Sequence, residues 1–535
     1  MKDNRLRAPS TDGALLAVPS LAEASAQFPR TSERLAGWDH DFQGRRADRL
    51  RRMVRSEVTA AARQFLSSHG LDVPEVPAPT AEGPLPPLVV TGHQPELFHP
   101  GVWVKNFATA ALAREHRGLG LNLIVDNDLP KASSIRVPLL ADHQLRTVRV
   151  EFDQWRGEAP YEDLVVHEEA AFASFADRVR SVLGPAIKDP ILNDFWPRAV
   201  AAAGTTSILG HRLAVARRGL EASWGFRNLE IPLSLLCETE GFHWFLCHIL
   251  AQLPRFQEIH NRALAEYRAH YGIRSKHHPV AALGRQGAWR EAPFWIWRKG
   301  QPRRRALLIR QLSRTMELRI AGEDEPLMEL PLASDREACC AVDRLRELPG
   351  KSVRLRTRAL TTTMFCRYLL GDLFIHGIGG AKYDELGDAI SRSFFGIEPP
   401  GFLTLSMTVR LGLPDRDAST GSLARIEREL RDLIYNPDRH LAEPLNEEVR
   451  TRIREKQREI QSNPLTRSQR VARFRNIRAI NGALLPYVQG PLDQLQRQRE
   501  QQVEDLAWNR MAHLREFAFV LHSEHRMKGI MSVFQ

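Results

Sequence analysis

The stretch TGHQPELFHPGVWVKNF, residues 91–107, holds the densest group of side chains able to do chemistry. It joins an apolar run to a helical pattern, so it is a strand-to-helix turn whose free backbone N–H groups attract anions. Gly92 allows close backbone approach, and the side chain of Lys105, one turn into the helix, leans back toward the turn. We predict that the turn binds an anionic ligand through Thr91, Gly92, His93, Gln94, His99, Gly101 and Lys105, with His93, His99 and Lys105 as catalytic candidates. The alternative is a structural turn with two surface histidines and one lysine.

A glycine-rich segment, HGIGGAKYD at residues 376–384, is the second group. Its glycines precede a helical pattern, an arrangement that cradles phosphates, although neither GxxxxGK[ST] nor GxGxxG is present. We predict that Lys382 acts in catalysis. The predicted ligand-binding residues here are His376, Gly377, Gly379, Gly380, Tyr383 and Asp384, joined by Arg358 upstream. A plain tight turn is the alternative.

A third polar group, VDNDLPKASS, follows the next apolar run of the chain. Asp126, Asn127 and Asp128 have the side chains to orient a sugar or an amine, and carboxylates also suit Mg²⁺. Paired aspartates equally often cap loops. We predict that these three residues contact the substrate. Mg²⁺ is an additional candidate cofactor, for which no residue is assigned as a ligand.

These groups need a common scaffold. Residues 88–90, 121–125 and 144–152 have the pattern of strands, and residues 101–116 have the pattern of a helix. Strand and helix alternate, with a polar loop after each strand, which predicts an α/β fold with a doubly wound parallel sheet. Ligands bind beyond the carboxyl ends of the strands in such sheets, so the turn at 91–105 and the segment at 376–384 should face one pocket.

Composition divides the rest of the chain. The predicted parts are an N-terminal helical arm and Pro-rich linker (1–80), the first half of the core (81–152), a helical and β connective insertion with a return to the core (153–350), the second half of the core (351–420) and a C-terminal α-helical coiled coil (421–535). In the last part, apolar residues recur at helical spacing from Leu423 to Ile434 and from Leu492 to Phe517. Such a stripe on a charged helix needs a partner face, so these helices should pack on each other and on a second copy.

The net charge is +11 and the isoelectric point is about 9.7. Because the basic residues are spread along the chain, we expect nucleic-acid binding to be unlikely; the densest cluster, residues 298–310, has the pattern of a hairpin tip. Five cysteines without a CxxC pair indicate neither a disulfide framework nor a zinc knuckle. No secretory signal and no membrane span are recognised, so we expect a cytoplasmic protein without membrane contact.

In this order the motifs resemble the bacillithiol biosynthesis cysteine-adding enzymes. That family has a TGQQ-x-GLF-x-GP turn where this chain has TGHQPELFHPG, an EDHD-like loop where it has IVDND, and GGPGEIAYW where it has HGIGGAKYD. An FG-x-x-x-P step and a helical tail follow in both. A weaker similarity of HQPELFHPGVWVKNF to the opening of WbqC-like proteins also implies a pocket for a small anionic molecule.

The resemblance implies a Rossmann-like core with a connective insertion, and a homodimer formed through the C-terminal coiled coil. It also implies an ATP-dependent ligase that joins cysteine to a glucosaminyl-malate thiol precursor. His93 replaces a family Gln, the acidic loop lacks its His, and Lys382 is additional, so the amino acid and its acceptor stay open. A second hypothesis is a non-catalytic ligand sensor or scaffold with a degenerate nucleotide-binding core, and a third is an Arg-rich nucleic-acid binder.

Overall fold

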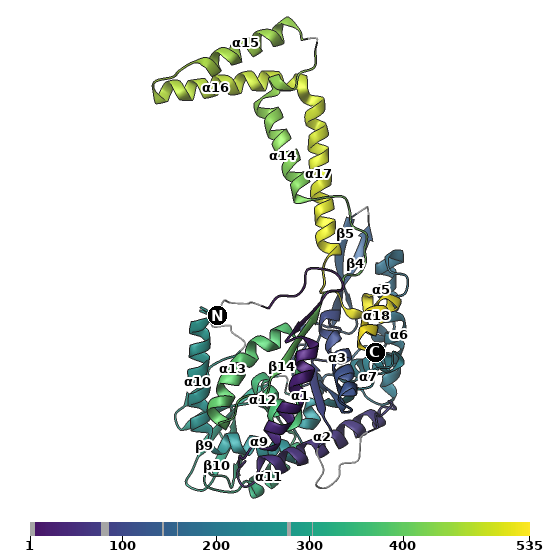
Figure 1. The fold of residues 1–535 in the computed structure, drawn as a ribbon, viewed down its shortest axis with the longest axis vertical. Coiled ribbons are helices and arrows are strands. Elements are labelled where there is room, and N and C mark those ends of the chain that lie inside the picture. Colours follow the sequence, from purple (N-terminus) through teal and green to yellow (C-terminus); the bar gives the residue numbers. More distant parts are fainter. Residues whose placement is uncertain are drawn as a thin grey trace. The chain divides into compact units, whose positions relative to one another are not determined.

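The computed structural model describes residues 6–75, 85–141, 144–157, 159–274, 280–301, 303–443 and 445–535 (Figure 1). The chain forms two compact units. The first unit comprises residues 1–137, 147–411 and 515–535, and the second comprises residues 138–146 and 412–514. No helix within the described ranges combines the length and the apolar character needed to cross a bilayer.

The main sheet of the first unit is the scaffold of the predicted site. Its described strands, in spatial order, are β1 (Leu15–Val18), β14 (Phe402–Met407), β13 (Leu373–His376), β2 (Leu88–His93), β3 (Leu119–Ile124) and β6 (Leu229–Pro232). All neighbours are parallel except β1, which is antiparallel to β14. The chain places β3 and β6 on one side of β2, and later places β13 and β14 on the other. The strand order therefore reverses between β2 and β13, which is where ligands bind in open α/β sheets.

Two of the predicted strand assignments change. Residues 15–18, which the sequence placed in an N-terminal arm, are the edge strand β1 of the main sheet. The predicted third strand is β5 (Gln144–Glu151), which among the described strands pairs with β4 (Ser134–Ala141) in a sheet separate from the main one. Alternating polar and apolar residues suit such a hairpin, because central parallel strands are buried on both faces and read as continuous apolar runs.

Helices cover the main sheet and connect its strands. In the first unit they are α1 (Leu21–Ala36), α2 (Ala47–Ser68), α3 (Pro100–Glu115), α4 (Glu169–Ala173), α5 (Phe175–Leu183), α6 (Leu192–Ala201), α7 (Leu209–Ser223), α8 (Leu233–Leu236), α9 (Glu240–Ala251), α10 (Leu253–His270), α11 (Cys339–Leu345), α12 (Ala359–Phe365), α13 (Ile378–Phe395) and α18 (Glu524–Met531). Residues 153–225, the start of the predicted connective insertion, are mostly helical. On one face of β3, Leu121 and Leu123 pack in a core that includes α2. Gly120 points to the opposite face, where a Cβ at this position would lie 3.1 Å from Thr109 of α3.

A second, antiparallel sheet lies in the chain between β6 and β13. Its described strands are β7 (Arg285–Gln286), β8 (Trp289–Arg298), β9 (Arg305–Gln311), β10 (Met316–Ile320), β11 (Met328–Leu330) and β12 (Val353–Thr357). The predicted hairpin is confirmed, because β8 pairs with β9 in antiparallel register. Strand β12 leads directly into α12 and β13, and so connects this sheet to the predicted site.

The second unit consists mainly of two helix pairs, α14 (Thr420–Tyr435) with α17 (Gln489–Ala512) and α15 (Glu447–Gln461) with α16 (Arg467–Leu484). The predicted apolar stripes meet there: Ile426, Leu430 and Leu433 pack with Val488 and Leu492. Three details of the prediction were wrong. Ile434 and Val503 of the stripes are exposed, and residues 515–535 leave the helix pairs and return to the first unit.

Candidate functional site

A cavity of about 440 Å³ opens at the carboxyl ends of β2 and β13, where the strand order reverses. Its wall brings together two of the predicted groups, the turn after β2 and the glycine-rich segment after β13. The lining residues include Gly92, His93, Gln94, His99, Gly101, Lys105, His376, Gly377, Gly379, Gly380, Tyr383, Ser406 and Arg515. We call this space the first cavity.

A second cavity of about 300 Å³ adjoins the first one. The two share the wall residues Gln94, Val125, Ala359, Thr362 and Tyr383. The second cavity also contains the predicted residues Asn127, Asp128 and Arg358, and it has a largely apolar wall that includes Phe256, Leu283, Trp295, Leu360 and Met364. The two cavities together therefore form a ligand space that extends from the turn after β2 and the glycine-rich segment to the apolar wall around Trp295.

The start of α3 is held tightly against the sheet. His99 caps the helix by accepting a hydrogen bond from the Gly101 N–H at 3.1 Å, and Pro100 occupies the first helical position. A Cβ at Gly101 would lie 2.3 Å from the Met407 carbonyl oxygen, so only glycine fits there. Thr91 is buried and donates to the Ile375 carbonyl at 2.9 Å, which joins β2 to β13 and gives this predicted ligand-binding residue a structural contact.

His93 and His99 are neutral at pH 7. Burial, together with the charge of Lys105, lowers the pKa of His93 to about 3. Burial and the charge of Arg515 lower the pKa of His99 to about 4. Both rings therefore contribute hydrogen bonds rather than positive charge to the predicted anion-binding turn.

Lys105 is the unusual cation of the first cavity. Its side chain is buried, and Nζ donates to the Gly92 carbonyl at 2.8 Å. No carboxylate of the described residues forms an ion pair with it. Burial and the nearby Arg217 lower the pKa of Lys105 to about 7. A buried ammonium without a counter-ion favours an anionic ligand, because the ligand would supply the missing negative charge.

The start of α13 offers free donors to the same cavity. The capping residue is Gly377, whose lack of a side chain leaves the helix end uncapped. In the described structure, no hydrogen bond engages the N–H groups of Ile378, Gly379 and Gly380. Long helices with such free N–H groups bind phosphate and carboxylate groups at their N-termini.

His376 and Asp384 form a buried pair beside these donors. The His376 Nε2 lies 2.6 Å from Asp384 Oδ2. Asp384 also accepts hydrogen bonds from Thr363 and Arg367, each at 2.8 Å. Burial alone would raise the pKa of Asp384, but His376 and Arg367 lower it to about 2, so it stays ionised. The other ring nitrogen, Nδ1, would lie 2.8 Å from a Cβ at Gly380 and makes no hydrogen bond to a described residue.

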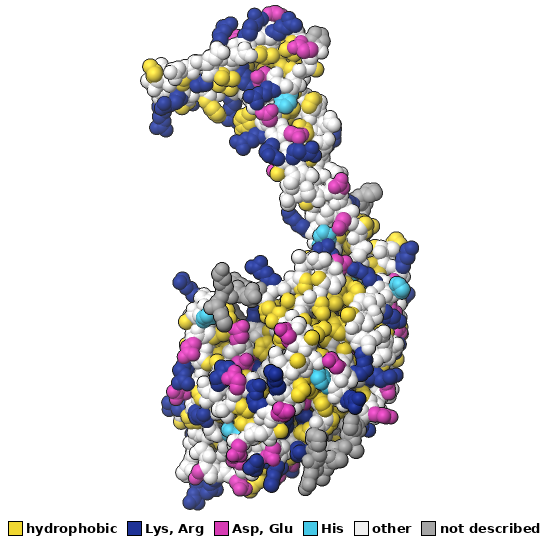
Figure 2. Space-filling model, in the orientation of Figure 1, with side chains coloured by type: hydrophobic (Ala, Val, Ile, Leu, Met, Phe, Trp, Pro, Cys, Tyr) yellow, Lys and Arg dark blue, Asp and Glu magenta, His cyan; other side chains and the backbone are white. Residues whose placement is uncertain are grey.

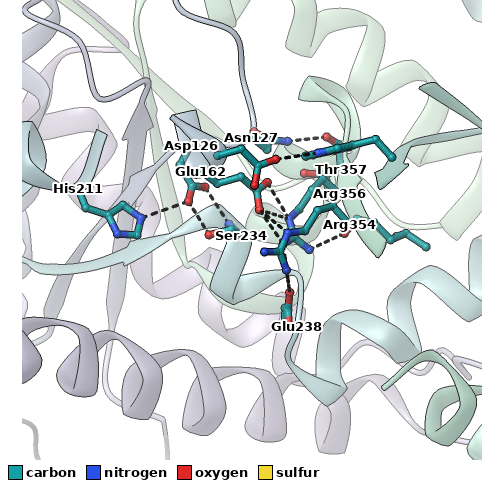
Figure 3. Close-up of polar contacts among 12 residues, drawn as sticks. Asp126, Asn127, Glu162, His211, Ser234, Glu238, Arg354, Arg356 and Thr357 are labelled. Carbon is teal, nitrogen blue, oxygen red and sulfur yellow. Dashed lines mark hydrogen bonds and ion pairs between the residues drawn. The ribbon is translucent and has the colours of Figure 1, made fainter. Parts of the chain in front are cut away.

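The acidic loop after β3 does not act as one group. Asp126 is fully buried and accepts hydrogen bonds from the Ser234 N–H at 2.9 Å and hydroxyl at 2.5 Å, with His211 nearby (Figure 3). It therefore has no ligand-facing role. Asp128 instead accepts from Gln94 at 2.8 Å and pairs with Arg304 at 3.0 Å on the cavity side. The two aspartates thus form no joint Mg²⁺ site, and the described residues contain no group of three His, Cys, Asp or Glu arranged to hold a metal.

Asn127 lies in the loop after β3 and Arg358 directly follows β12, and both line the second cavity. Asn127 donates to the Thr357 carbonyl at 2.9 Å, as Figure 3 shows, and its own carbonyl accepts from Arg304. The Arg358 guanidinium lies 4.1 Å from the ring centroid of Trp295 and pairs with Glu291 at 2.6 Å. Arg304 lies 5.2 Å from the same ring. The indole and the two guanidinium groups form a flat, polarised surface suited to a planar ligand group.

Lys382 does not belong to the site. It is exposed on α13, and it does not line either cavity. Helical geometry explains the difference from the prediction, because the helix begins at Ile378 and has turned the Lys382 side chain outward, while Asp384 points inward.

Arg515 and Ser406 are residues of the first cavity that the sequence did not indicate. The Arg515 guanidinium donates to the Ser406 hydroxyl at 3.0 Å. Arg515 was missed because residues 421–535 were assigned to one coiled coil. A signal existed: the apolar run FAFVL, residues 517–521, breaks the charged helical pattern. Phe519 of this run packs on Trp103 of α3 with ring centroids 4.4 Å apart, which anchors the segment.

Comparison with protein-family models finds no family that matches this chain, and comparison with curated proteins finds no match either.

Proposed function

We propose that this chain is an ATP-dependent carbon–nitrogen ligase with a Rossmann-like core. The observation that carries the proposal is the first cavity, in which the free N-terminus of α13 meets the buried Lys105 at the reversal of strand order. The parallel strands follow the chain order 3-2-1-4-5, which is the order of dinucleotide-binding sheets. The motifs that resemble the bacillithiol biosynthesis cysteine-adding enzymes supply two walls of this cavity.

The residues present fit a nucleotide. Ile378, Gly379 and Gly380 would donate backbone N–H groups to its phosphates, and Lys105 and Arg515 would supply positive charge. The apolar second cavity, with Trp295 in its wall, suits a planar base. When bound, ATP would supply the activation of a substrate carboxylate.

The chain's own residues would then act on the amine partner. Asp384 accepts a hydrogen bond from the Nε2–H of His376. In the neutral ring, Nδ1 would carry the lone pair and would take up the proton that an attacking amine releases as the carbon–nitrogen bond forms. Neutral His99 and the backbone donors would orient the carboxylate. His93 donates through Nδ1 to the Gln94 carbonyl at 3.1 Å, so its Nε2 would accept a hydrogen bond from a substrate donor instead. By the resemblance, the carboxylate belongs to a cysteine-like amino acid and the amine to an amino-sugar thiol precursor.

We expect ATP to stabilise the full chain against thermal unfolding. Ligand at about 100 times its dissociation constant adds about 2.7 kcal/mol to the free energy of unfolding. Differential scanning fluorimetry with ATP, ADP and inorganic phosphate at matched ionic strength measures this. Absence of a shift with all three compounds would refute nucleotide binding. A shift with ATP, but no phosphate release after addition of cysteine and glucosaminyl-malate, would favour the ligand-sensor hypothesis.

We further propose that the chain forms a homodimer through a coiled coil of the second unit. Three large apolar side chains of α14 and α17 stay uncovered: Ile434, Tyr435 and Val503 are 39%, 47% and 43% exposed. We expect light scattering at micromolar concentration to give about twice the single-chain mass of 60.7 kDa. A mass equal to that of one chain would contradict the dimer.

A further inference from the structure

Helix α16 of the second unit carries positive charge that no acidic residue of the same helix balances. It contains five arginines, Arg467, Arg470, Arg473, Arg475 and Arg478, and no acidic residue. The whole stretch between Glu459 and Asp493 is free of acidic residues. Although basic residues are spread along the chain as a whole, this helix concentrates them.

The neighbouring helix shows the contrast. In α15, Arg452 pairs with Glu448 at 2.9 Å, and Arg454 pairs with Glu447. Among the arginines of α16, Arg473 donates to the Ile460 carbonyl at 2.6 Å. The side chains of the other four arginines form no hydrogen bond or ion pair with any described residue. Their charge is therefore available to a partner.

Apolar side chains lie among these arginines. Arg467, Val471, Phe474 and Arg478 follow one another at spacings of four, three and four residues, which places them on one face of the helix over about 16 Å. Val471 is 43% exposed and Phe474 is 58% exposed. Figure 2 shows both dark blue basic and yellow hydrophobic side chains exposed over the α15–α16 pair.

We propose that this face of α16 binds a single-stranded nucleic acid. Guanidinium groups bind phosphates through paired hydrogen bonds, and an exposed Phe ring stacks on an unpaired base. A helix that lies on an anionic membrane separates its basic and apolar sides, whereas here Val471 and Phe474 stand between Arg467 and Arg478 on the same face. A second copy of the same face would bring like charges together. A single strand offers phosphates to the arginines and unpaired bases to the ring of Phe474. This binding is independent of the proposed ligase activity.

Fluorescence anisotropy of the full chain with a labelled single-stranded RNA of about 20 nucleotides tests the proposal. Each phosphate contact contributes a slope of about −0.7 to the plot of log K against log salt, so four arginines predict a slope of about −2.8. We expect the double variant R467Q/R478Q to bind at least about 10-fold more weakly and to reduce the slope by about 1.4. F474A should weaken binding about 5-fold or more with an unchanged slope, as expected for lost stacking.

The matched control is R452Q/R454Q, which removes two arginines from α15 that are already paired; its affinity should stay within about twofold of the wild type. Equal weakening by both double variants, or no binding by the wild type, would overturn the proposal. Equally tight binding of a duplex RNA would overturn the stacking role of Phe474 and the preference for a single strand. Co-sedimentation with phosphatidylserine vesicles that R467Q/R478Q abolishes, without RNA binding, would assign the face to a membrane instead.

Discussion

Replacing Lys105 by methionine is expected to make the protein more stable at pH 7 and to weaken ATP binding about 10- to 100-fold. The fold change reflects the loss of a charged hydrogen-bond donor from the first cavity. The stability change follows from the pKa of Lys105, which is about 7 in the folded protein and near 10.5 in the unfolded chain. Between these values the unfolded state binds more protons, so the lysine costs stability, and this cost grows as the pH falls from 10.5 to 7. Methionine removes this cost but also loses the hydrogen bond to the Gly92 carbonyl. The free energy of unfolding should therefore rise by about 1–3 kcal/mol in total.

Urea unfolding at pH 7 and pH 9.5 measures the stability, and calorimetric titration with ATP measures the affinity. The gain of the variant over the wild type should be larger at pH 7, where the wild-type lysine is most penalised. Lys382→Met is the matched control, because Lys382 is exposed and outside both cavities; its stability and its ATP affinity should equal those of the wild type. A Lys105→Met protein that is less stable and still binds ATP would show that Lys105 only supports the turn.

Replacing Asp372 by asparagine is expected to lower the free energy of unfolding of the first unit by about 3–5 kcal/mol. Asp372 immediately precedes β13 and is buried. It pairs with Arg51 at 2.5 Å and with Arg55 at 2.6 Å, and it accepts from the Leu88 N–H of β2 at 2.8 Å. Asparagine keeps the shape but leaves two buried guanidinium groups without a counter-ion. The change should also loosen the β2–β13 pair, whose ends form the first cavity.

Chemical unfolding followed from pH 7 to pH 3 measures this effect. Burial alone would raise the pKa of Asp372, but Arg55 and Arg51 hold it below its ordinary value. Its contribution is therefore present above the unfolded pKa near 4 and is lost as the pH falls further, so the difference between wild type and variant should narrow below about pH 4. Asp48→Asn, which breaks an exposed pair with Arg46, should cost less than about 1 kcal/mol. An equal loss of unfolding free energy in Asp372→Asn and Asp48→Asn would contradict the stabilising role of the buried Asp372–Arg51–Arg55 network.

The two helix N-termini of the first cavity show where sequence reasoning succeeded and where it stopped. Glycines, Pro100 and a preceding apolar run mark strand-to-helix turns locally, so the sequence alone predicts both turns. The sequence did not predict which group each of these side chains contacts in the folded protein. His99 and Gly377 have similar places in the sequence pattern, yet His99 caps its own helix while Gly377 leaves the α13 donors free. Asp126 and Asp128 are two residues apart, yet one is enclosed by Ser234 and the other faces a cavity.

By itself the sequence determined the local elements: the apolar strands around 88–90 and 121–125, the helix at 101–116, the hairpin near 291–310 and the helical stripes after residue 421. These depend on periodicity and on turn residues within one segment. The tertiary structure alone decided that β1 completes the main sheet and that the segment with Arg515 returns to the first cavity. It also decided that Lys105 has no counter-ion among the described residues while Asp372 has two. Such facts depend on which distant residues share a buried space, where burial and ion pairing set the charge state, and no local spacing encodes that choice.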